Sequence, residues 1–421
     1  MKALNLVIAT IVILSSVVIL AEGSSATPVD GTGYEAELNG QYFNELQDAL
    51  DVAEDGDTVR VLRDIVYDGT DGLIIKSGIT LDGLKSDRTV CQISTSTASR
   101  LMKTYDVYGV HLTSPVTIRN LDLLNTTDES SRCLDTRSLE SSLTIENVTM
   151  TVDNQAKENQ VFNIGGNVDS TLRITVDDSR FITNGIGYCF ISFNTIDMTV
   201  TDSYFEGWCA IYLKGTMNND HGTSNSVVDV RDSTIRSFND AGYDPDIPDN
   251  NSFGAIVLED KDISVTLTDM DVEVSVDSLS DQYLFSVNEI EENGILVSGP
   301  LTGNELSIGG DRTVVRFTGD TAAMYKSDNE DNTFEITGGS YNIDVSKYLS
   351  DSLHQNPDGS ISDDSSNIPP IWDDDDEYVP PIIPAQPEDS GDDDTVTIVA
   401  CAAAAVVAAL MAAYLIIDRR Q

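Results

Sequence analysis

The sequence predicts an all-β protein that folds as a parallel β-helix. Three features predict this fold: an internal repeat, an alternation of apolar and polar residues inside each copy, and a turn-forming residue directly after it. Each copy reads apolar, any, apolar, any, then Asn, Asp or Gly, with a further apolar residue three places on. The turn residues of the clearest copies are Asn120, Asn147, Asp178, Asp202, Asp232 and Asp269, and those of two looser copies are Gly310 and Gly338.

The spacing and the internal period together select a stack of coils. Successive turn residues are 24 to 41 residues apart, which fits one coil of strands and loops per copy. The alternation, as in Val116 and Ile118 or Val265 and Leu267, predicts a short strand with one buried face. Asn, Asp and Gly tolerate a left-handed backbone, so we expect a corner at each of these positions. This column therefore has a structural role rather than a catalytic one.

The N-terminus predicts a secretory signal peptide over residues 1–26. A basic start at Lys2 is followed by an apolar stretch from Leu4 to Ala21 and then by small residues suited to cleavage. Retention of this stretch as a membrane anchor is the alternative.

Residues 34–58 are predicted to cap the first coil. A strand pair around Asn39-Gly40 precedes a helix from Asn44 to Ala53, with Asn44 as its N-cap. Such a helix would cover the apolar end that the first coil of a stack exposes. The coils themselves are expected over residues 59–350.

Two segments resemble a known group of proteins. ELNGQYFNELQDALDVAEDGDTVRVLRDI, with GITLDG at 78–83, resembles the opening of right-handed, pectate-lyase-like parallel β-helix domains in prokaryotic adhesin-like surface proteins. GGSYNIDVSKYLSDSLHQNPDGSI at 338–361 resembles their closing motif. The resemblance spans about residues 34–361 and implies a right-handed helix outside the cell. It leaves the activity open, because this fold hosts lyases, hydrolases, esterases and binding proteins.

The C-terminal part is predicted to be a stalk and an anchor. Residues 351–394 hold 7 of the 12 prolines, 14 acidic residues and no Lys or Arg, a composition that stays extended. Residues 395–417 carry no charge and are long enough for one transmembrane helix. Arg419 and Arg420 place residues 418–421 in the cytoplasm, which gives a single-pass type I topology. A cleaved lipid-anchor signal is the alternative.

The charge limits the classes of partner. The chain has 71 acidic and 24 basic residues, a formal net charge of -47. Nucleic acid and anionic membrane surfaces are therefore poor partners, and no nucleic acid is expected, whereas basic ligands, divalent cations or a high-salt environment fit better. The charge could also serve only to keep an exposed protein in solution.

Few residues suggest chemistry. Asp178, Arg180 and His221 are the candidates if the protein is an enzyme, as acids and bases acting on a polysaccharide. Asp178 already belongs to the corner column, and the Asn-x-Asp and Arg-x-Lys pairs that resemblance to pectin-degrading β-helices would imply are missing. We therefore expect no catalysis.

Asp244, Asp246 and Asp249 converge in one loop and form a candidate Ca²⁺ site; no other cofactor is indicated. The glycosylation sequons begin at Asn125, Asn147 and Asn250. Asn125 and Asn250 are expected to be exposed, whereas Asn147 is a corner residue.

Cys91, Cys133, Cys189 and Cys209 precede the predicted anchor. Cys189 and Cys209 occupy matching places in successive coils, which predicts stacked thiols in the core. Parallel in-register side chains are poorly directed for a disulfide, so we expect free thiols.

The sequence thus predicts a membrane-anchored surface protein that binds an extracellular glycan or surface protein. A tethered polysaccharide lyase or hydrolase on the same fold is the alternative, and a structural cell-surface spacer is the second alternative.

Overall fold

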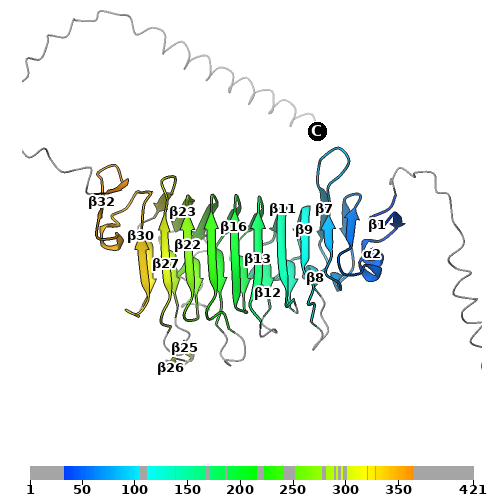
Figure 1. Ribbon diagram of the computed structural model, residues 1–421, viewed down its shortest axis with the longest axis horizontal. Coiled ribbons are helices and arrows are strands. Elements are labelled where there is room, and N and C mark those ends of the chain that lie inside the picture. The colour runs from blue at the N-terminus through cyan, green and yellow to red at the C-terminus, as the bar shows by residue number, and fades with distance from the viewer. Residues whose placement is uncertain are drawn as a thin grey trace, which may run out of the picture. The chain divides into compact units, whose positions relative to one another are not determined.

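The structure is a computed structural model that describes residues 33–104, 111–137, 139–156, 158–165, 170–184, 187–215, 222–239, 252–276, 281–288, 291–292, 295–296, 301–319, 321–327 and 329–363. Within these residues the chain is all-β with long parallel sheets, consistent with the predicted parallel β-helix (Figure 1). The predicted signal peptide (1–26), transmembrane helix (395–417) and tail (418–421) lie outside them, as do residues 364–394 of the predicted stalk. No helix in the described ranges is long and apolar enough to cross a membrane.

The larger sheet has 20 strands: two rows that meet at a corner, and β1 (Ala36–Leu38) and β2 (Gln41–Phe43), which add to it in antiparallel pairing. Each strand of the two rows pairs in parallel with its counterpart in the next coil, as Leu143 with Ile174 and Met150 with Phe181. The first row contains β3 (Thr58–Val61), β6 (Thr80–Asp82), β9 (Val116–Asn125), β11 (Ser142–Val152), β13 (Leu172–Asp177), β16 (Ile196–Thr201), β19 (Val227–Arg231), β22 (Ser264–Thr268), β27 (Glu305–Gly309) and β30 (Thr333–Ile336). β9 and β11 continue around the corner into the second row, which also contains β4 (Ile65–Tyr67), β7 (Cys91–Thr95), β14 (Arg180–Thr183), β17 (Tyr204–Gly207), β20 (Thr234–Asn239), β23 (Asp271–Val276), β28 (Val314–Thr318) and β31 (Ser340–Tyr341).

A second parallel sheet of nine strands forms the remaining face of the stack. Its strands follow the second row in each coil, so every coil up to the one that contains β29 contributes to both sheets. They are β5 (Leu73–Ile75), β8 (Arg100–Thr104), β10 (Arg132–Thr136), β12 (Asn159–Ile164), β15 (Gly187–Ser192), β18 (Cys209–Leu213), β21 (Ser252–Leu258), β24 (Asp281–Val287) and β29 (Ala322–Ser327). A short antiparallel pair, β25 (Glu291–Glu292) and β26 (Ile295–Leu296), lies between β24 and β27 in the sequence.

The corner column is confirmed as a set of left-handed backbone positions. All six of its Asn and Asp members have φ between 45° and 56°. Gly310 also has positive φ, at 95°. In the last coil the left-handed residue is Gly339 rather than the predicted Gly338, so that corner turns one residue later. These short polar residues accept the backbone conformation because they lack a branched Cβ and glycine lacks Cβ altogether.

A ladder of buried serines follows the corner column from coil to coil. The Oγ atoms of Ser179, Ser203 and Ser233 each donate to the carbonyl two residues earlier, at 2.6 to 2.7 Å. Each Oγ also accepts an N–H from the preceding coil, as Ser203 Oγ does from Ser179 N at 3.1 Å. The ladder therefore satisfies N–H groups that the corner removes from the regular strand pairing.

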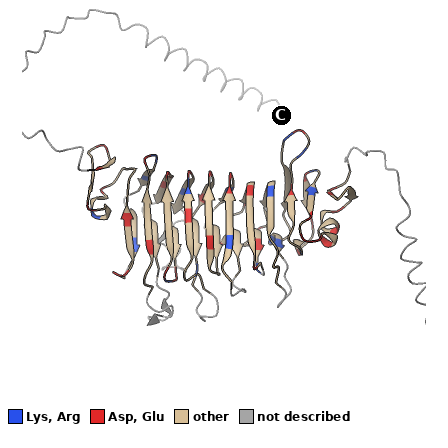
Figure 2. Ribbon diagram, in the orientation of Figure 1, with Lys and Arg blue, Asp and Glu red and all other residues tan. Residues whose placement is uncertain are grey.

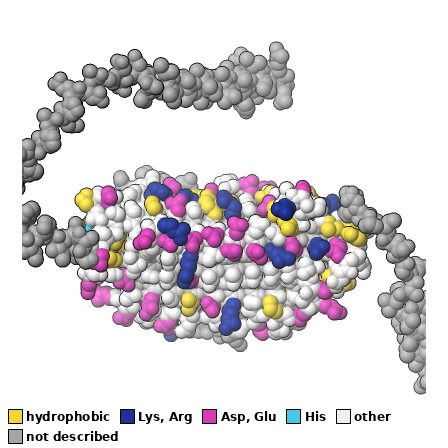
Figure 3. Space-filling view, turned by 45° about the horizontal axis from the view of Figure 1, so that its top comes forward, with side chains coloured by type: hydrophobic (Ala, Val, Ile, Leu, Met, Phe, Trp, Pro, Cys, Tyr) yellow, Lys and Arg dark blue, Asp and Glu magenta, His cyan; other side chains and the backbone are white. Residues whose placement is uncertain are grey.

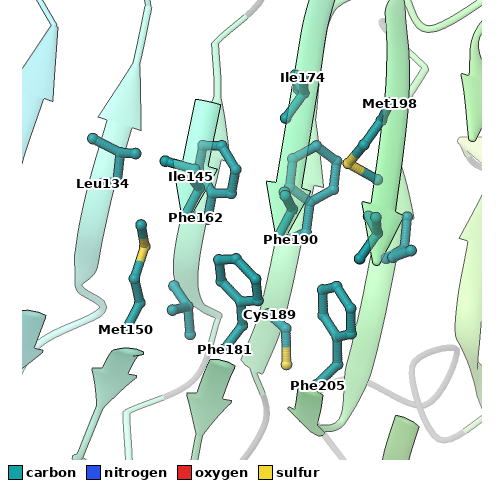
Figure 4. Packing of buried hydrophobic residues seen from close by; sticks show 14 of the residues in the cluster. Leu134, Ile145, Met150, Phe162, Ile174, Phe181, Cys189, Phe190, Met198 and Phe205 are labelled. Atoms are coloured by element: carbon teal, nitrogen blue, oxygen red, sulfur yellow. The ribbon is translucent and has the colours of Figure 1, made fainter. Parts of the chain in front are cut away.

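The interior of the stack is continuous and apolar. The predicted alternation is confirmed, because residues such as Ile118, Ile145 and Val176 are buried. Phenylalanines from several coils pack one above another: the Phe181 ring lies 6.0 Å from Phe162 and 5.1 Å from Phe205, centroid to centroid (Figure 4). Such packing between coils is the main favourable contribution to the stability of a repeat protein.

The N-terminal cap has the predicted elements. β1 (Ala36–Leu38) and β2 (Gln41–Phe43) form a hairpin whose turn residues, Asn39 and Gly40, both have positive φ. Helix α2 (Leu46–Val52) follows and buries its apolar side. The predicted N-cap at Asn44 is wrong: Glu45 occupies that position without a side-chain cap, and Glu35 Oε2 accepts from Leu46 N at 3.0 Å instead.

The folded part continues beyond residue 350, where the stalk was predicted to begin. The 3-10 helix η2 (Ser346–Tyr348) is followed by an antiparallel hairpin of β32 (Leu353–Gln355) and β33 (Ile361–Asp363). Ile361 N donates to Gly339 O at 2.8 Å, which ties the hairpin to the last corner. The acidic composition of this segment led to the prediction of an extended stalk. The turn residues Asp358-Gly359, of which Gly359 has a φ of 89°, indicate the hairpin instead.

Candidate binding surface

The nine-stranded sheet has an outer face whose positions follow from a break in the alternation of its side chains. In β15, Tyr188 pairs with Cys209 and Phe190 with Ile211, so the register is constant and Cys189 lies level with Ala210. Cys189 and Phe190 both lie in the core, whereas Tyr188 and Ile191 belong to a separate apolar cluster. Two consecutive residues per strand thus face inward, and the residues before and after them face outward.

Two outward columns result, and their chemistry changes along the stack. The first column, from β8 to β18, reads Arg100, Arg132, Gln160, Tyr188 and Cys209. The second reads Lys103, Asp135, Asn163, Ile191 and Tyr212. The face is therefore polar and rich in arginine over β8, β10 and β12, and apolar with aromatic rings over β15 and β18.

The polar part contains an arginine cluster, which we define as Arg100, Arg132 and Arg137 around Asp135. Arg100 Nε, Arg132 NH1 and Arg137 Nε lie 2.9, 3.0 and 3.1 Å from the same atom, Asp135 Oδ2. The Asp135 side chain is 0% exposed, while those of Arg132 and Arg137 are 22% and 33% exposed. Asp135 Oδ1 accepts from Asn163 Nδ2 at 2.7 Å, so the carboxylate is held from both sides.

The positive charges of the arginine cluster oppose one another. Burial lowers the pKa of Arg132, the ion pair with Asp135 acts against this, and the neighbouring Arg100 and Arg137 lower it further. Arg132 Nε also donates to Gln160 Oε1 at 2.7 Å, which fixes its orientation. The cluster is thus a rigid arrangement in which cations outnumber the carboxylate they share.

Gly165 makes room for one member of the arginine cluster. A Cβ at this position would lie 2.8 Å from Arg137 Cγ and 3.1 Å from Arg137 Cα. Gly165 follows β12 directly, so its backbone forms the surface on which the Arg137 side chain rests. Any larger residue would displace Arg137.

The apolar part contains an aromatic cluster of Tyr188, Trp208 and Tyr212. The Tyr188 ring lies 5.9 Å from Trp208 and 5.1 Å from Tyr212, centroid to centroid. All three side chains are buried, together with Cys209 and Val257. Burial raises the pKa of both tyrosines well above the usual value.

A carboxyl group lies beside the aromatic cluster. Tyr212 OH donates to Glu259 Oε1, and Lys214 Nζ lies 5.4 Å from the Tyr212 ring centroid. Glu259 Oε2 is inaccessible to solvent and has no hydrogen-bond partner among the described residues. Burial raises the pKa of Glu259, and the charge of Lys214 and the Tyr212 hydrogen bond offset only part of this.

The residues predicted for catalysis do not form a site within the described chain. Asp178 is exposed at its corner with a φ of 45°. Arg180 is exposed on β14, where its guanidinium carbon lies 4.1 Å above the Tyr204 ring. No hydrogen bond or ion pair joins these two residues in the described structure, and His221 lies outside it. The corner thus accounts for Asp178.

Of the residues predicted for metal binding and glycosylation, some lie outside the described part of the chain and one can be assessed. Asp244, Asp246, Asp249 and Asn250 lie outside the described residues, within which no group of His, Cys, Asp and Glu could hold a metal ion. Asn125 is described, and the expectation that it is exposed is wrong: its side chain is buried. Its Nδ2, the atom that a glycan would modify, donates to Ala98 O at 3.0 Å and Arg132 O at 2.8 Å.

The four described cysteines are buried and free, as expected. The expected stacking of Cys189 on Cys209 is wrong. Cys209 pairs with Tyr188 and faces outward into the aromatic cluster, whereas Cys189 faces the core. The two cysteines are one position apart in the register of β15 and β18, so their thiols lie on opposite faces of the sheet.

Acidic residues occur along the whole stack, and basic residues occur at fewer places (Figure 2). On the face in Figure 3 the two charges are interspersed. Some acids of the corner column are neutralised there: Arg312 forms ion pairs with both Asp232 and Asp269. The remaining excess of acid over base is spread over the surface rather than gathered at one site.

The arginine cluster and Glu259 were not identified from the sequence. One signal was available, because Arg100 and Arg132 are 32 residues apart, close to the length of one coil. In comparisons with known proteins, no family model matches this chain and no curated protein is significantly similar to it.

Proposed function

We propose that the protein is a membrane-anchored extracellular surface protein that binds a glycan or another surface ligand through the outer face of its nine-stranded sheet. In this proposal a right-handed parallel β-helix of the adhesin-like type presents that face. The acidic segment after it serves as a stalk, and residues 395–417 form a single-pass type I anchor.

The contrast between the outer faces of the two sheets carries this proposal. On the first row of the larger sheet, one outward column reads Thr117, Thr144, Thr175 and Thr199, which suits a solvated strand and needs no ligand. The first outward column of the nine-stranded sheet instead holds Arg100, Arg132 and Gln160, which are partly exposed, before it continues into the buried Tyr188. Arginine is enriched where proteins bind ligands, since it combines a large contact area with polar groups.

A rigid stack also suits a surface that recognises an extended polymer. Adjacent coils are about 4.8 Å apart, so side chains of one column form a row with a fixed spacing. Side chains on paired strands lose little further freedom on binding, and that lowers the entropic cost of association.

Glu259 favours a second candidate function, a tethered polysaccharide lyase or hydrolase. A shielded carboxyl with a raised pKa, hydrogen-bonded to Tyr212 and near Lys214, has the properties of a general acid. The binding proposal is preferred because Glu259 Oε2 is inaccessible to solvent in the described structure, so this carboxyl is closed to a substrate.

The test uses the full-length protein in detergent with arrays of neutral, uronate-containing and sulfated oligosaccharides. Saturable binding with the oligosaccharides recovered intact is the expected result. If shortened or unsaturated oligosaccharides are recovered, the protein is an enzyme and the binding proposal is wrong. Failure to bind or cleave any member, with the protein folded by circular dichroism, would favour a structural spacer.

A further inference from the structure

We propose that the arginine cluster is a subsite for an anionic group, a carboxylate or sulfate, carried by the ligand. This inference rests on the proposed binding function and specifies the class of glycan: one that carries acidic groups. It contrasts with the overall charge of the protein, which disfavours anionic partners elsewhere on its surface.

The ratio of charges in the cluster points to this ligand. Three guanidinium groups share one oxygen of Asp135, and Arg132 and Arg137 have no other acidic partner among the described residues. Elsewhere in the described structure the ratio is different: Arg312 alone bridges two carboxylates, Asp232 and Asp269. In a protein with 71 acidic residues and 24 basic ones, Arg132 and Arg137 thus bring two positive charges to one carboxylate of the described structure.

The surplus has a physical consequence for binding. Part of each guanidinium is withdrawn from water, so repulsion among the three groups is weakly screened and the free site is under electrostatic strain. A bound anion would relieve this strain. The rest of the acidic surface opposes such a ligand less at physiological salt, since the screening length is about 8 Å.

The geometry suits a planar or tetrahedral oxyanion. Arginine presents paired N–H donors that match two oxygens of a carboxylate or sulfate. The contacts to Asp135 use Nε of Arg100 and Arg137 and NH1 of Arg132, and the side chains of Arg132 and Arg137 remain partly exposed. Arg100 and Arg132 also lie one coil apart in the same column, so their guanidinium groups follow one another along the sheet.

Asp135 positions the arginines rather than closing the site. It is completely buried and is anchored by Asn163, so it fixes the inner side of each guanidinium. Gly165 has a similar role toward Arg137. Arg137 is therefore the residue at which substitution should change binding with the least effect on folding.

The experiment measures the affinity of the full-length protein for an oligogalacturonate, a sulfated oligosaccharide and a neutral oligoglucan of equal length. Arg137→Gln should weaken binding of at least one acidic probe about tenfold, the loss of one charge-assisted contact. Arg137→Lys should recover part of this loss, and Gly165→Ala should reproduce it by displacing Arg137. The control Arg316→Gln removes an exposed arginine on β28 and should leave every affinity unchanged.

Preference for the uronate or for the sulfated probe identifies the anion. Binding of the acidic probes that Arg137→Gln and Gly165→Ala leave intact would overturn the inference, with unchanged urea midpoints showing that the variants fold. Binding of the neutral probe as tightly as the acidic probes would overturn it as well, while leaving the proposed function in place. If no glycan binds, both fail.

Discussion

The side-chain amide of Gln47 bonds both backbone polar groups of Ile74. Gln47 Oε1 accepts from Ile74 N at 2.8 Å, and Gln47 Nε2 donates to Ile74 O at 3.2 Å. β5 is an edge strand of the nine-stranded sheet, so the backbone N–H and C=O of Ile74 would otherwise lack a partner on that side. One glutamine on the capping helix α2 thus takes the place of a missing strand.

We predict that Gln47→Ala destabilises the protein by about 2 kcal/mol, because two backbone groups lose their partner near a buried helix. The free energy of unfolding in urea measures this loss, and amide exchange at Ile74 should become faster. Gln92→Ala, at an exposed position on β7, is the matched control. Equal stability of the two variants would show that the cap does not depend on this contact.

The left-handed backbone of the corner column predicts different effects on stability for alanine and glycine substitutions. Asp202 has a φ of 48° and is exposed, so its replacement tests the backbone alone. Asp202→Ala should destabilise by about 1 to 2 kcal/mol because alanine resists the left-handed region. Asp202→Gly should be close to neutral. A larger loss for glycine than for alanine in urea unfolding would contradict a backbone role.

Glu259 gives a pH dependence. Its folded pKa is raised, so between the unfolded value, near 4.5, and the folded value the native state binds more protons. Stability contributed by this group is therefore lost as the pH rises through that window, by about 1.4 kcal/mol for each pH unit that separates the two values. Lys214 and Tyr212 are the described groups that act on it.

Glu259→Gln removes this titration and keeps an acceptor for Tyr212 OH. The stability of the variant relative to the native protein should therefore increase from pH 4 to pH 7, as followed by melting temperature. Glu305→Gln, at an exposed position on β27, controls for the loss of one negative charge. If the difference in melting temperature between Glu259→Gln and the native protein does not change with pH, the folded pKa of Glu259 is not raised.

The free cysteines give a prediction about reactivity. Burial raises the pKa of Cys91 to about 11 and that of Cys133 to about 12, and it raises those of Cys189 and Cys209 as well. In a Cys401→Ser background, the folded protein should resist an alkylating reagent at pH 8, and all four thiols should react once urea unfolds it. Rapid labelling of Cys209 in the folded protein would show that the aromatic cluster opens.

The sequence predicted the first two strands of each coil well, because alternation and left-handed corners are local properties. Val116, Asn120 and Leu123 reveal their roles from their neighbours alone. The serine ladder was less visible, since Ser203 looks like an ordinary surface residue until the preceding coil is placed beneath it.

The candidate surface depended on information that the sequence does not carry locally. Whether Cys189 and Cys209 share a face depends on the register of β15 and β18, in which Cys209 lies level with Tyr188 and not with Cys189. A break in the alternation turns Arg132 and Asp135 outward while the two residues between them face the core. Arg137 joins them after the strand ends, from a position with no periodic pattern.

The central claim is that the outer face of the nine-stranded sheet is the ligand-binding surface. The most direct measurement is hydrogen–deuterium exchange of the full-length protein with and without the oligosaccharide that binds it most tightly. The account predicts slower exchange in β8, β10, β12 and the residues after each of them, with β13, β16 and β19 unchanged. Protection confined to the larger sheet, with none in the nine-stranded sheet, would contradict it.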